Sequence, residues 1–105
     1  MKIKTSELTG AALDWAVAKC LGVDYISFLN MHQCGHFHFS TDWAEGGPII
    51  ERENIELERR EDWTAKMCFQ PVTRHEDGPT PLIAAMRCFC ASKLGDGVEV
   101  PDELS

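Results

Sequence analysis

The sequence predicts an α+β fold in which one antiparallel four-stranded sheet, built from two hairpins, is covered by an N-terminal and a C-terminal helix. Apolar residues recur every three or four positions near both ends of the chain, which is typical of amphipathic helices. Between them, apolar and polar residues alternate in short runs separated by turn-forming residues, which is typical of strands. At 105 residues and 44% hydrophobic composition the chain has the size of a single domain, which we place at residues 1–105.

The first helix is predicted to begin after Thr9, whose hydroxyl can cap it, and to end at Gly22, which adopts a left-handed conformation cheaply. One apolar stripe follows from helical spacing. Its members are Leu13, Ala16, Val17, Cys20 and Leu21. Trp15 lies off this stripe, so we expect it either to pack against a second surface or to contact a partner.

The first hairpin is predicted from a β-prone run at residues 25–29 and a second run at 36–39, with a turn that begins at Asn30. In the second run Phe37 and Phe39 alternate with histidines. Strand periodicity would place the two aromatic rings on one face and the histidines on the other.

Residues 40–48 are predicted to form a helical turn or structured loop, and Pro48 to begin a short helix through Arg52. The second hairpin follows from alternation at residues 55–58 and 63–70, joined by the polar residues 59–62.

The last helix is predicted to follow a polar loop at residues 71–79. Thr80 can cap this helix, Pro81 suits its first position, and Gly95 ends it after Leu94. Residues 96–105 are expected to form a frayed acidic tail.

Charge and cysteine content limit the classes of function. Ten basic residues against 17 acidic ones give a net charge of −7, which argues against general nucleic-acid binding and permits docking on a basic partner. The five cysteines are odd in number and have no C-x-x-C spacing. The chain opens without a signal peptide, and none of its apolar runs has the length of a membrane span. We therefore expect a cytoplasmic protein with reduced thiols and no membrane association.

A row of potential metal ligands occupies every second position from residue 32 to residue 38. Its members are His32, Cys34, His36 and His38. On one straight strand the row would extend over about 20 Å, so its side chains could not converge on one ion. We therefore expect a polar strand face and assign no metal, no cofactor and no catalytic residue. The histidines could still make this surface sensitive to pH.

Two segments are candidates for a binding site, and our hypothesis is that the Trp43–Gly47 loop and the helix start at Thr80 could form one pocket, to which Trp15 could also contribute. In the first segment, Gly46 and Gly47 free the backbone beside Trp43, whose ring can stack on a ligand. The second segment is the N-terminus of the last predicted helix, at Thr80, where free backbone amides can attract an anion. Each also has a purely structural interpretation, as a tight turn and an ordinary capped helix. The ligand- or partner-binding candidates are Trp15, Thr41, Asp42, Trp43, Gly46, Gly47, Arg52, Thr80 and Arg87.

Three blocks that contain these candidates, the third of them interrupted at Cys90, resemble the NinX-like family, small uncharacterised proteins of temperate bacteriophages and prophages. They are residues 4–18 (KTSELTGAALDWAVA), 40–53 (STDWAEGGPIIERE), 78–89 (GPTPLIAAMRCF) and 91–95 (ASKLG). Residues 25–39 and 59–77 depart from the family pattern. The resemblance implies a phage accessory protein expressed in the bacterial cytoplasm, and it transfers no catalytic residue.

Three functions follow as hypotheses. The first is a non-enzymatic binding protein that acts on a host factor, with inhibition of a defence system as one form. The second is a sponge for a nucleotide or other anionic small molecule, in which Trp43 stacks on the base while Arg52 and Arg87 hold the phosphate. The third is an enzyme whose site forms across a homodimer, an assembly that small size and three tryptophans make plausible.

Overall fold

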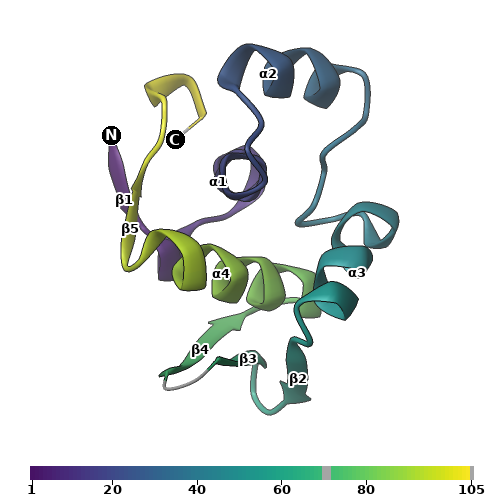
Figure 1. Cartoon of the computed structure of the whole chain (residues 1–105), viewed down its shortest axis with the longest axis vertical. Helices are drawn as coiled ribbons and strands as arrows, with labels where there is room; N and C mark the ends of the chain where they lie inside the picture. Colours follow the sequence, from purple (N-terminus) through teal and green to yellow (C-terminus); the bar gives the residue numbers. More distant parts are fainter. Residues whose placement is uncertain (70–71, 105) are drawn as a thin grey trace.

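Helix α4 (Pro81–Leu94) lies at the centre of the molecule, with a sheet on one side and helix α1 (Gly10–Cys20) on the other (Figure 1). The computed structural model describes residues 1–69 and 72–104. Helix α2 (Tyr25–Gln33) lies beyond α1, and helix α3 (Trp43–Arg52) packs at the N-terminal end of α4. Short 3-10 helices occupy Thr5–Glu7 and Asp102–Leu104. No helix in the described part of the chain is long and apolar enough to cross a membrane.

The described strands form two antiparallel sheets. Strands β2 (Glu56–Arg59), β3 (Trp63–Phe69) and β4 (Val72–Gly78) form a three-stranded meander that packs on α4. Strands β1 (Lys2–Lys4) and β5 (Gly97–Glu99) join the two ends of the chain in a two-stranded sheet. The α+β class is confirmed, but the prediction of one four-stranded sheet made of two hairpins is wrong.

Of the two predicted hairpins, the second is confirmed by the pairing of β2 with β3, in which Leu57 lies opposite Ala65. The predicted loop at residues 71–79 is wrong over its described part, because residues 72–78 form β4. Polar residues occupy both faces of this edge strand. One of them, Arg74, lies opposite Met67 of β3 in the register, and its guanidinium donates a hydrogen bond to the carbonyl of Ala91, in α4, at 2.8 Å. Gln70 and Pro71, where the predicted strand ends and the predicted loop begins, lie outside the described residues.

The first predicted hairpin is wrong, because residues 25–29 begin α2 and residues 36–39 belong to the connection from α2 to α3. The side chain of Asp24 caps α2 by accepting a hydrogen bond from the Ser27 amide at 2.8 Å. Phe28 is then buried on the side of α2 that faces α1. Phe37 has a left-handed backbone, with φ of 61°, which interrupts the extended conformation expected of a strand.

The helix boundaries follow the capping signals in part. Gly22 has φ of 83°, as expected after α1, but the hydroxyl of Thr9 makes no capping hydrogen bond. Helix α3 begins at Trp43, five positions earlier than predicted, because the Asp42 carboxylate accepts from the Ala44 amide at 2.9 Å. Thr80 caps α4 as predicted, accepting from the Ile83 amide at 3.1 Å.

The core joins α1, α2 and α4 with the inner face of the meander. Trp15 is buried, and its ring lies 5.2 Å from that of Tyr25 and 5.5 Å from that of Phe28. Of the two expectations for Trp15, packing against a second surface is therefore the one observed. The largest fully buried side chains are Phe28, Phe89, Leu8, Leu13, Met86, Val17 and Val100.

The C-terminal segment differs from the expected frayed tail. In β5, Val98 is buried and pairs with Ile3 of β1. Val100 is also buried, and its carbonyl accepts a hydrogen bond from the N-terminal ammonium of Met1 at 2.9 Å. The hydroxyl of Tyr25 donates to Glu103 at 2.5 Å, which ties the end of the chain to α2. Ser105 lies outside the described residues.

Candidate functional site

A pocket of about 230 Å³ lies where α3 and α4 begin. Ser40 and Thr41 line it from the segment that leads into α3, and Trp43 lines it from the first turn of that helix. The opposite wall is the start of α4, residues 80–83. Two segments almost 40 positions apart in the sequence, each predicted as a candidate, thus share one pocket.

Gly46 allows α3 to approach this closely. A Cβ atom at position 46 would lie 2.5 Å from the backbone oxygen of Phe39 and 2.7 Å from Cδ2 of Leu82. Both distances are shorter than a carbon atom tolerates, and one of the neighbours is backbone. A glycine at this position is therefore required for α3, the preceding segment and α4 to meet as they do.

Trp43 is the exposed aromatic residue of the site, with 53% of its surface accessible. Gly47 lies one helical turn later, where a Cβ atom would be 3.7 Å from Cε3 of the Trp43 ring. The indole thus rests over a residue without a side chain and leaves much of its own surface to solvent. An exposed, supported aromatic ring beside a small pocket is a common feature of protein-binding surfaces.

Ser40 is 2% exposed, and its two polar groups differ in their environment. Its amide donates to Oδ1 of Asp14, in α1, at 2.9 Å. Its hydroxyl is buried and, among the described residues, has no hydrogen-bond partner. A buried hydroxyl without a partner is energetically unfavourable, which makes Ser40 an unusual residue in the wall of this pocket.

The two helix ends at the pocket differ in charge. Asp42 and Glu45 place negative charge at the start of α3, whereas the first turn of α4, all of it described, contains no acidic residue. Since Pro81 has no N–H and the Ile83 amide donates to Thr80, Leu82 has the first-turn amide left without a capping partner. This end of α4 is therefore a weakly positive wall lined by neutral side chains.

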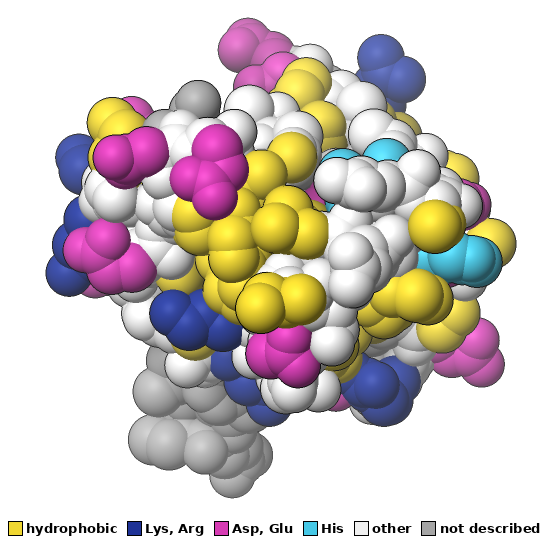
Figure 2. Space-filling view, turned by 90° about the horizontal axis from the view of Figure 1, so that it is seen from above, with side chains coloured by type: hydrophobic (Ala, Val, Ile, Leu, Met, Phe, Trp, Pro, Cys, Tyr) yellow, Lys and Arg dark blue, Asp and Glu magenta, His cyan; other side chains and the backbone are white. Residues whose placement is uncertain are grey.

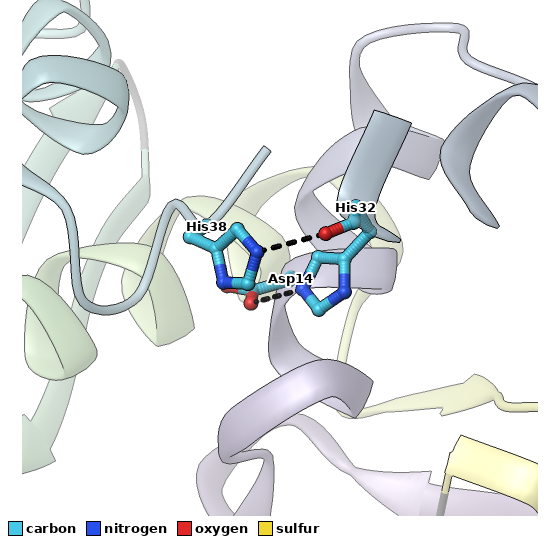
Figure 3. A group of neighbouring side chains, drawn as sticks. All are labelled: Asp14, His32 and His38. Atoms are coloured by element: carbon cyan, nitrogen blue, oxygen red, sulfur yellow. Dashed lines mark hydrogen bonds and ion pairs between the residues drawn. The ribbon is translucent and has the colours of Figure 1, made fainter. Parts of the chain in front are cut away.

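A second cluster consists of Asp14, His32 and His38 (Figure 3), and it contacts Ser40 through Asp14. Nε2 of His32 lies 3.0 Å from Oδ2 of Asp14, and Nε2 of His38 lies 3.0 Å from the backbone oxygen of His32. The two imidazole rings are stacked, with centroids 3.9 Å apart and planes inclined by 16°. Because a carbonyl only accepts, Nε2 of His38 is the donor in its hydrogen bond.

The predicted row of metal ligands on one strand is wrong, since His32 belongs to α2, Cys34 follows this helix, and His36 and His38 lie in the connection to α3. The fold nevertheless brings His32 and His38 together with Asp14, so that one potential ligand atom from each lies within 4.8 Å of the others. Sequence spacing could not predict this, because Asp14 is 18 residues from His32.

The arrangement of the rings determines what this cluster can do. A metal ion binds imidazole in the plane of the ring, and two stacked parallel rings cannot both direct a lone pair at one ion. Coordination would require one ring to rotate out of the stack. As it stands, the cluster fixes the carboxylate of Asp14, and Asp14 in turn fixes Ser40 in the wall of the pocket.

The arginines grouped with Trp43 by the sequence lie elsewhere. Arg52 is at the C-terminal end of α3, where its Nε lies 3.0 Å from Glu53. Arg87 donates to the carbonyls of Leu8 at 2.7 Å and Asp77 at 2.9 Å. It lines a separate cavity of about 370 Å³.

That separate cavity is rich in acidic groups. Its charged lining residues are Arg87, Asp62, Glu76 and Asp77. Burial lowers the pKa of the Arg87 guanidinium and raises the pKa of the Glu76 carboxyl. The cavity is therefore poorly suited to hold a phosphate.

The nine predicted site residues thus fall into three groups. Thr41, Trp43 and Thr80 line the pocket. Asp42, Gly46 and Gly47 shape it through the cap and close packing of α3. Trp15, Arg52 and Arg87 are not part of it. Ser40 was missed, because its burial and its hydrogen bond to Asp14 arise from tertiary structure, and the sequence contains no signal for that contact.

The fold and the pocket define a small α+β protein with a partly exposed aromatic residue beside a small, mostly apolar recess. The family model described as "Bacteriophage P22, NinX" matches residues 4–93, and the chain therefore belongs to this family of bacteriophage proteins. The resemblance stated from the sequence is confirmed, and the match extends through the segments that depart from the pattern. No curated protein matches the chain.

Proposed function

We propose that this phage accessory protein is a non-enzymatic binding protein that acts on a protein of the bacterial host, with inhibition of a defence system as one form of that action. The observation that carries this proposal is the half-exposed ring of Trp43 beside the pocket between α3 and α4. Tryptophan is one of the residue types enriched among the side chains that dominate the energy of protein interfaces.

The size of the pocket favours a protein partner. At about 230 Å³ it is smaller than the roughly 300–1,000 Å³ of typical small-molecule sites. It can accept one side chain or one end of a chain. A partner that inserts such a group would also cover the Trp43 ring, which is how anchored interfaces gain affinity.

The same geometry gives less support to a nucleotide sponge. That hypothesis needs Arg52 and Arg87 close to Trp43, and both arginines are engaged elsewhere. Among the described residues, no arrangement favours the third hypothesis, an enzyme with its site across a homodimer. Screening of thermal stability against a panel of nucleotides tests the sponge directly, since a captured ligand raises the melting temperature.

The proposal is tested by affinity capture from host lysate with the wild type, Trp43→Ala and a matched surface variant, Ile26→Ala. Figure 2 shows an apolar patch on the face where α2 lies, and Ile26 of α2 is 71% exposed. Both substitutions remove an exposed apolar side chain, so they compare two surfaces on equal terms.

We expect a specific host protein to be retained by the wild type and by Ile26→Ala, and to be lost with Trp43→Ala. The infection phenotype of phage that carries Trp43→Ala should then match that of a deletion. Capture that depends on Ile26 and is indifferent to Trp43 would overturn the assignment of the site. A deletion without effect on infection, together with no specific capture, would overturn the function.

A further inference from the structure

Two cysteines meet where helix α1 packs on helix α4 (Figure 1). Cys20 is the last residue of α1 and continues its buried stripe. The preceding members of that stripe, Leu13, Ala16 and Val17, have no exposed surface. Cys90 lies in α4 and is fully buried as well. Both cysteines are free thiols, and the thiol of Cys90 forms a hydrogen bond with the sulfur of Cys20.

The two thiols differ in their access to solvent. Cys90 has no exposed surface, whereas Cys20 is only partly buried, so a small solute can reach it. Two lysine ammonium groups act on this outer thiol. Lys19 precedes it in α1, and Lys93 lies one turn after Cys90 in α4. The site therefore has a reachable thiol beside positive charge, in contact with a second thiol that solvent does not reach.

These contacts separate the chemical states of the two sulfur atoms. The hydrogen bond from Cys90 lowers the pKa of Cys20, burial opposes this effect, and the charges of Lys93 and Lys19 lower the pKa further. The hydrogen bond to Cys20 and burial raise the pKa of Cys90 well above its ordinary value. Since the thiolate, and not the thiol, is the nucleophile, Cys20 is the reactive member and Cys90 retains its proton.

We propose that Cys20 and Cys90 form a redox modification site, in which a hydroperoxide oxidises Cys20 and Cys90 then converts it to an intramolecular disulfide between α1 and α4. Oxidation-sensitive cysteines in proteins combine solvent access, a thiolate and a neighbouring resolving cysteine. All three features occur in this pair. The inference goes beyond the proposed binding function, because neither cysteine lines the pocket at Trp43.

The two steps balance with hydrogen peroxide as the oxidant. The Cys20 thiolate attacks one peroxide oxygen, the O–O bond breaks, and Cys20 sulfenic acid and hydroxide are formed. The sulfur of Cys90 then attacks the sulfur of Cys20, and the S–O bond breaks. The displaced hydroxide takes up the proton of Cys90 and leaves as water. Together the two sulfur atoms lose two electrons, which reduce the peroxide to water and hydroxide.

A disulfide at this position would join two helices that are already packed on each other. It would close the chain between Cys20 and Cys90, a segment that contains α2, α3, the meander and most of α4. A cross-link that encloses so long a segment restricts the unfolded chain. The oxidised protein should therefore unfold at a higher temperature than the reduced protein.

The test exposes the reduced full chain to hydrogen peroxide and alkylates the remaining thiols at intervals under denaturing conditions. Peptide mass spectrometry then follows each cysteine separately. Cys34 and Cys68 are internal controls, because both are exposed whereas Cys20 is partly buried. If exposure alone decided reactivity, these two controls would be oxidised first.

We expect Cys20 to be oxidised before Cys34 and Cys68. The Cys20 and Cys90 peptides should then appear as one species that lacks two hydrogen atoms and separates on reduction. In Cys90→Ala, Cys20 should stop at the sulfenic acid, which dimedone traps, and in Cys20→Ala, Cys90 should remain a thiol.

Cys88→Ala is the matched control for Cys90→Ala. Cys88 is also fully buried in α4, but its thiol donates to the carbonyl of Arg74 at 3.5 Å. This variant should form the disulfide between Cys20 and Cys90 as the native chain does.

Oxidation of Cys34 or Cys68 ahead of Cys20 would overturn the inference. Accumulation of Cys20 sulfinic acid, or of an intermolecular disulfide, in the native chain would also overturn it, because Cys90 would then not resolve Cys20. The order of oxidation in the native chain needs no substitution, so it decides the question even if Cys90→Ala does not fold.

Discussion

The carboxylate of Asp14, in α1, accepts a hydrogen bond from the backbone amide of Ser40 at 2.9 Å, and this contact ties the core helix to the wall of the candidate site. The second oxygen of the same carboxylate is bound by His32 at 3.0 Å. Asp14 is 3% exposed and Ser40 2%, so the Ser40 amide depends on this acceptor, whereas the side chain of His32 is 21% exposed.

We predict that Asp14→Ala lowers the free energy of unfolding by about 3 kcal/mol, because it leaves the buried Ser40 amide and the partly buried ring of His32 without their acceptor. Asp14→Asn, which retains one acceptor oxygen, should cost less. Urea unfolding measures both, with Asp24→Ala, the loss of an exposed helix cap, as a reference of about 1 kcal/mol. An Asp14→Ala variant as stable as this reference would contradict the role assigned to the contact.

Gly46 and Gly47 form a matched pair within α3. Gly46→Ala places a methyl group against Phe39 and Leu82, so we expect a loss of about 2 kcal/mol and a change in Trp43 fluorescence. Gly47→Ala meets only ordinary contact with Trp43 and should gain up to about 1 kcal/mol, since alanine favours the helix. Equal effects of the two substitutions on thermal unfolding would show that α3 does not pack as described.

The partly buried carboxyl of Glu76 gives a pH dependence of defined sign. Burial raises its pKa above the ordinary value, although Arg74 and Arg87 partly oppose the shift. The folded state therefore binds this proton more readily than the unfolded state, so its contribution to stability decreases as pH rises from the ordinary pKa through the raised one. We expect Glu76→Gln to be more stable than the wild type at neutral pH.

The advantage of Glu76→Gln should decrease through about pH 4 and disappear by about pH 3, where the wild-type carboxyl is protonated in both states. Urea midpoints measured across this range test the prediction. Glu58→Gln, which changes an exposed carboxylate on β2, serves as the control and should show little of this trend. A Glu76→Gln variant that is less stable at neutral pH would mean that the attraction of the carboxylate to Arg74 and Arg87 outweighs the cost of burial.

The C-terminal segment is predicted to contribute to stability. Val100 is 1% exposed, and Val100→Ala should lower the free energy of unfolding by about 2 kcal/mol, from lost burial and the cavity left behind. The neighbouring exposed Glu99→Ala should change it by less than about 0.5 kcal/mol. If Val100→Ala leaves the midpoint of thermal unfolding unchanged, the C-terminal segment is frayed and the prediction is wrong.

Local signals in the sequence predicted the elements whose structure depends on neighbouring residues. Helix α1 follows from its apolar stripe, α4 from the Thr80 cap and Pro81, and the β2–β3 hairpin from strict alternation. The predictions for helix α2 and strand β4 were wrong, because the local pattern of α2 is typical of a strand and that of β4 is typical of a loop. The β-prone run at residues 25–29 is made helical by the Asp24 cap and by burial of Phe28 on α1. The polar strand β4 is stabilised by pairing with β3 and by contacts with α4.

By itself the sequence determined the family, the mixed fold class and the two segments that carry the candidate site. Only the tertiary structure decided that Trp43 and the start of α4 line one pocket, that Arg52 and Arg87 lie outside it, and that Ser40 belongs to it. The physical reason is the range of the interactions. Caps and periodicity act over a few residues, whereas the pocket depends on Gly46 meeting Leu82 and on Asp14 holding Ser40, contacts between positions 26 or more residues apart.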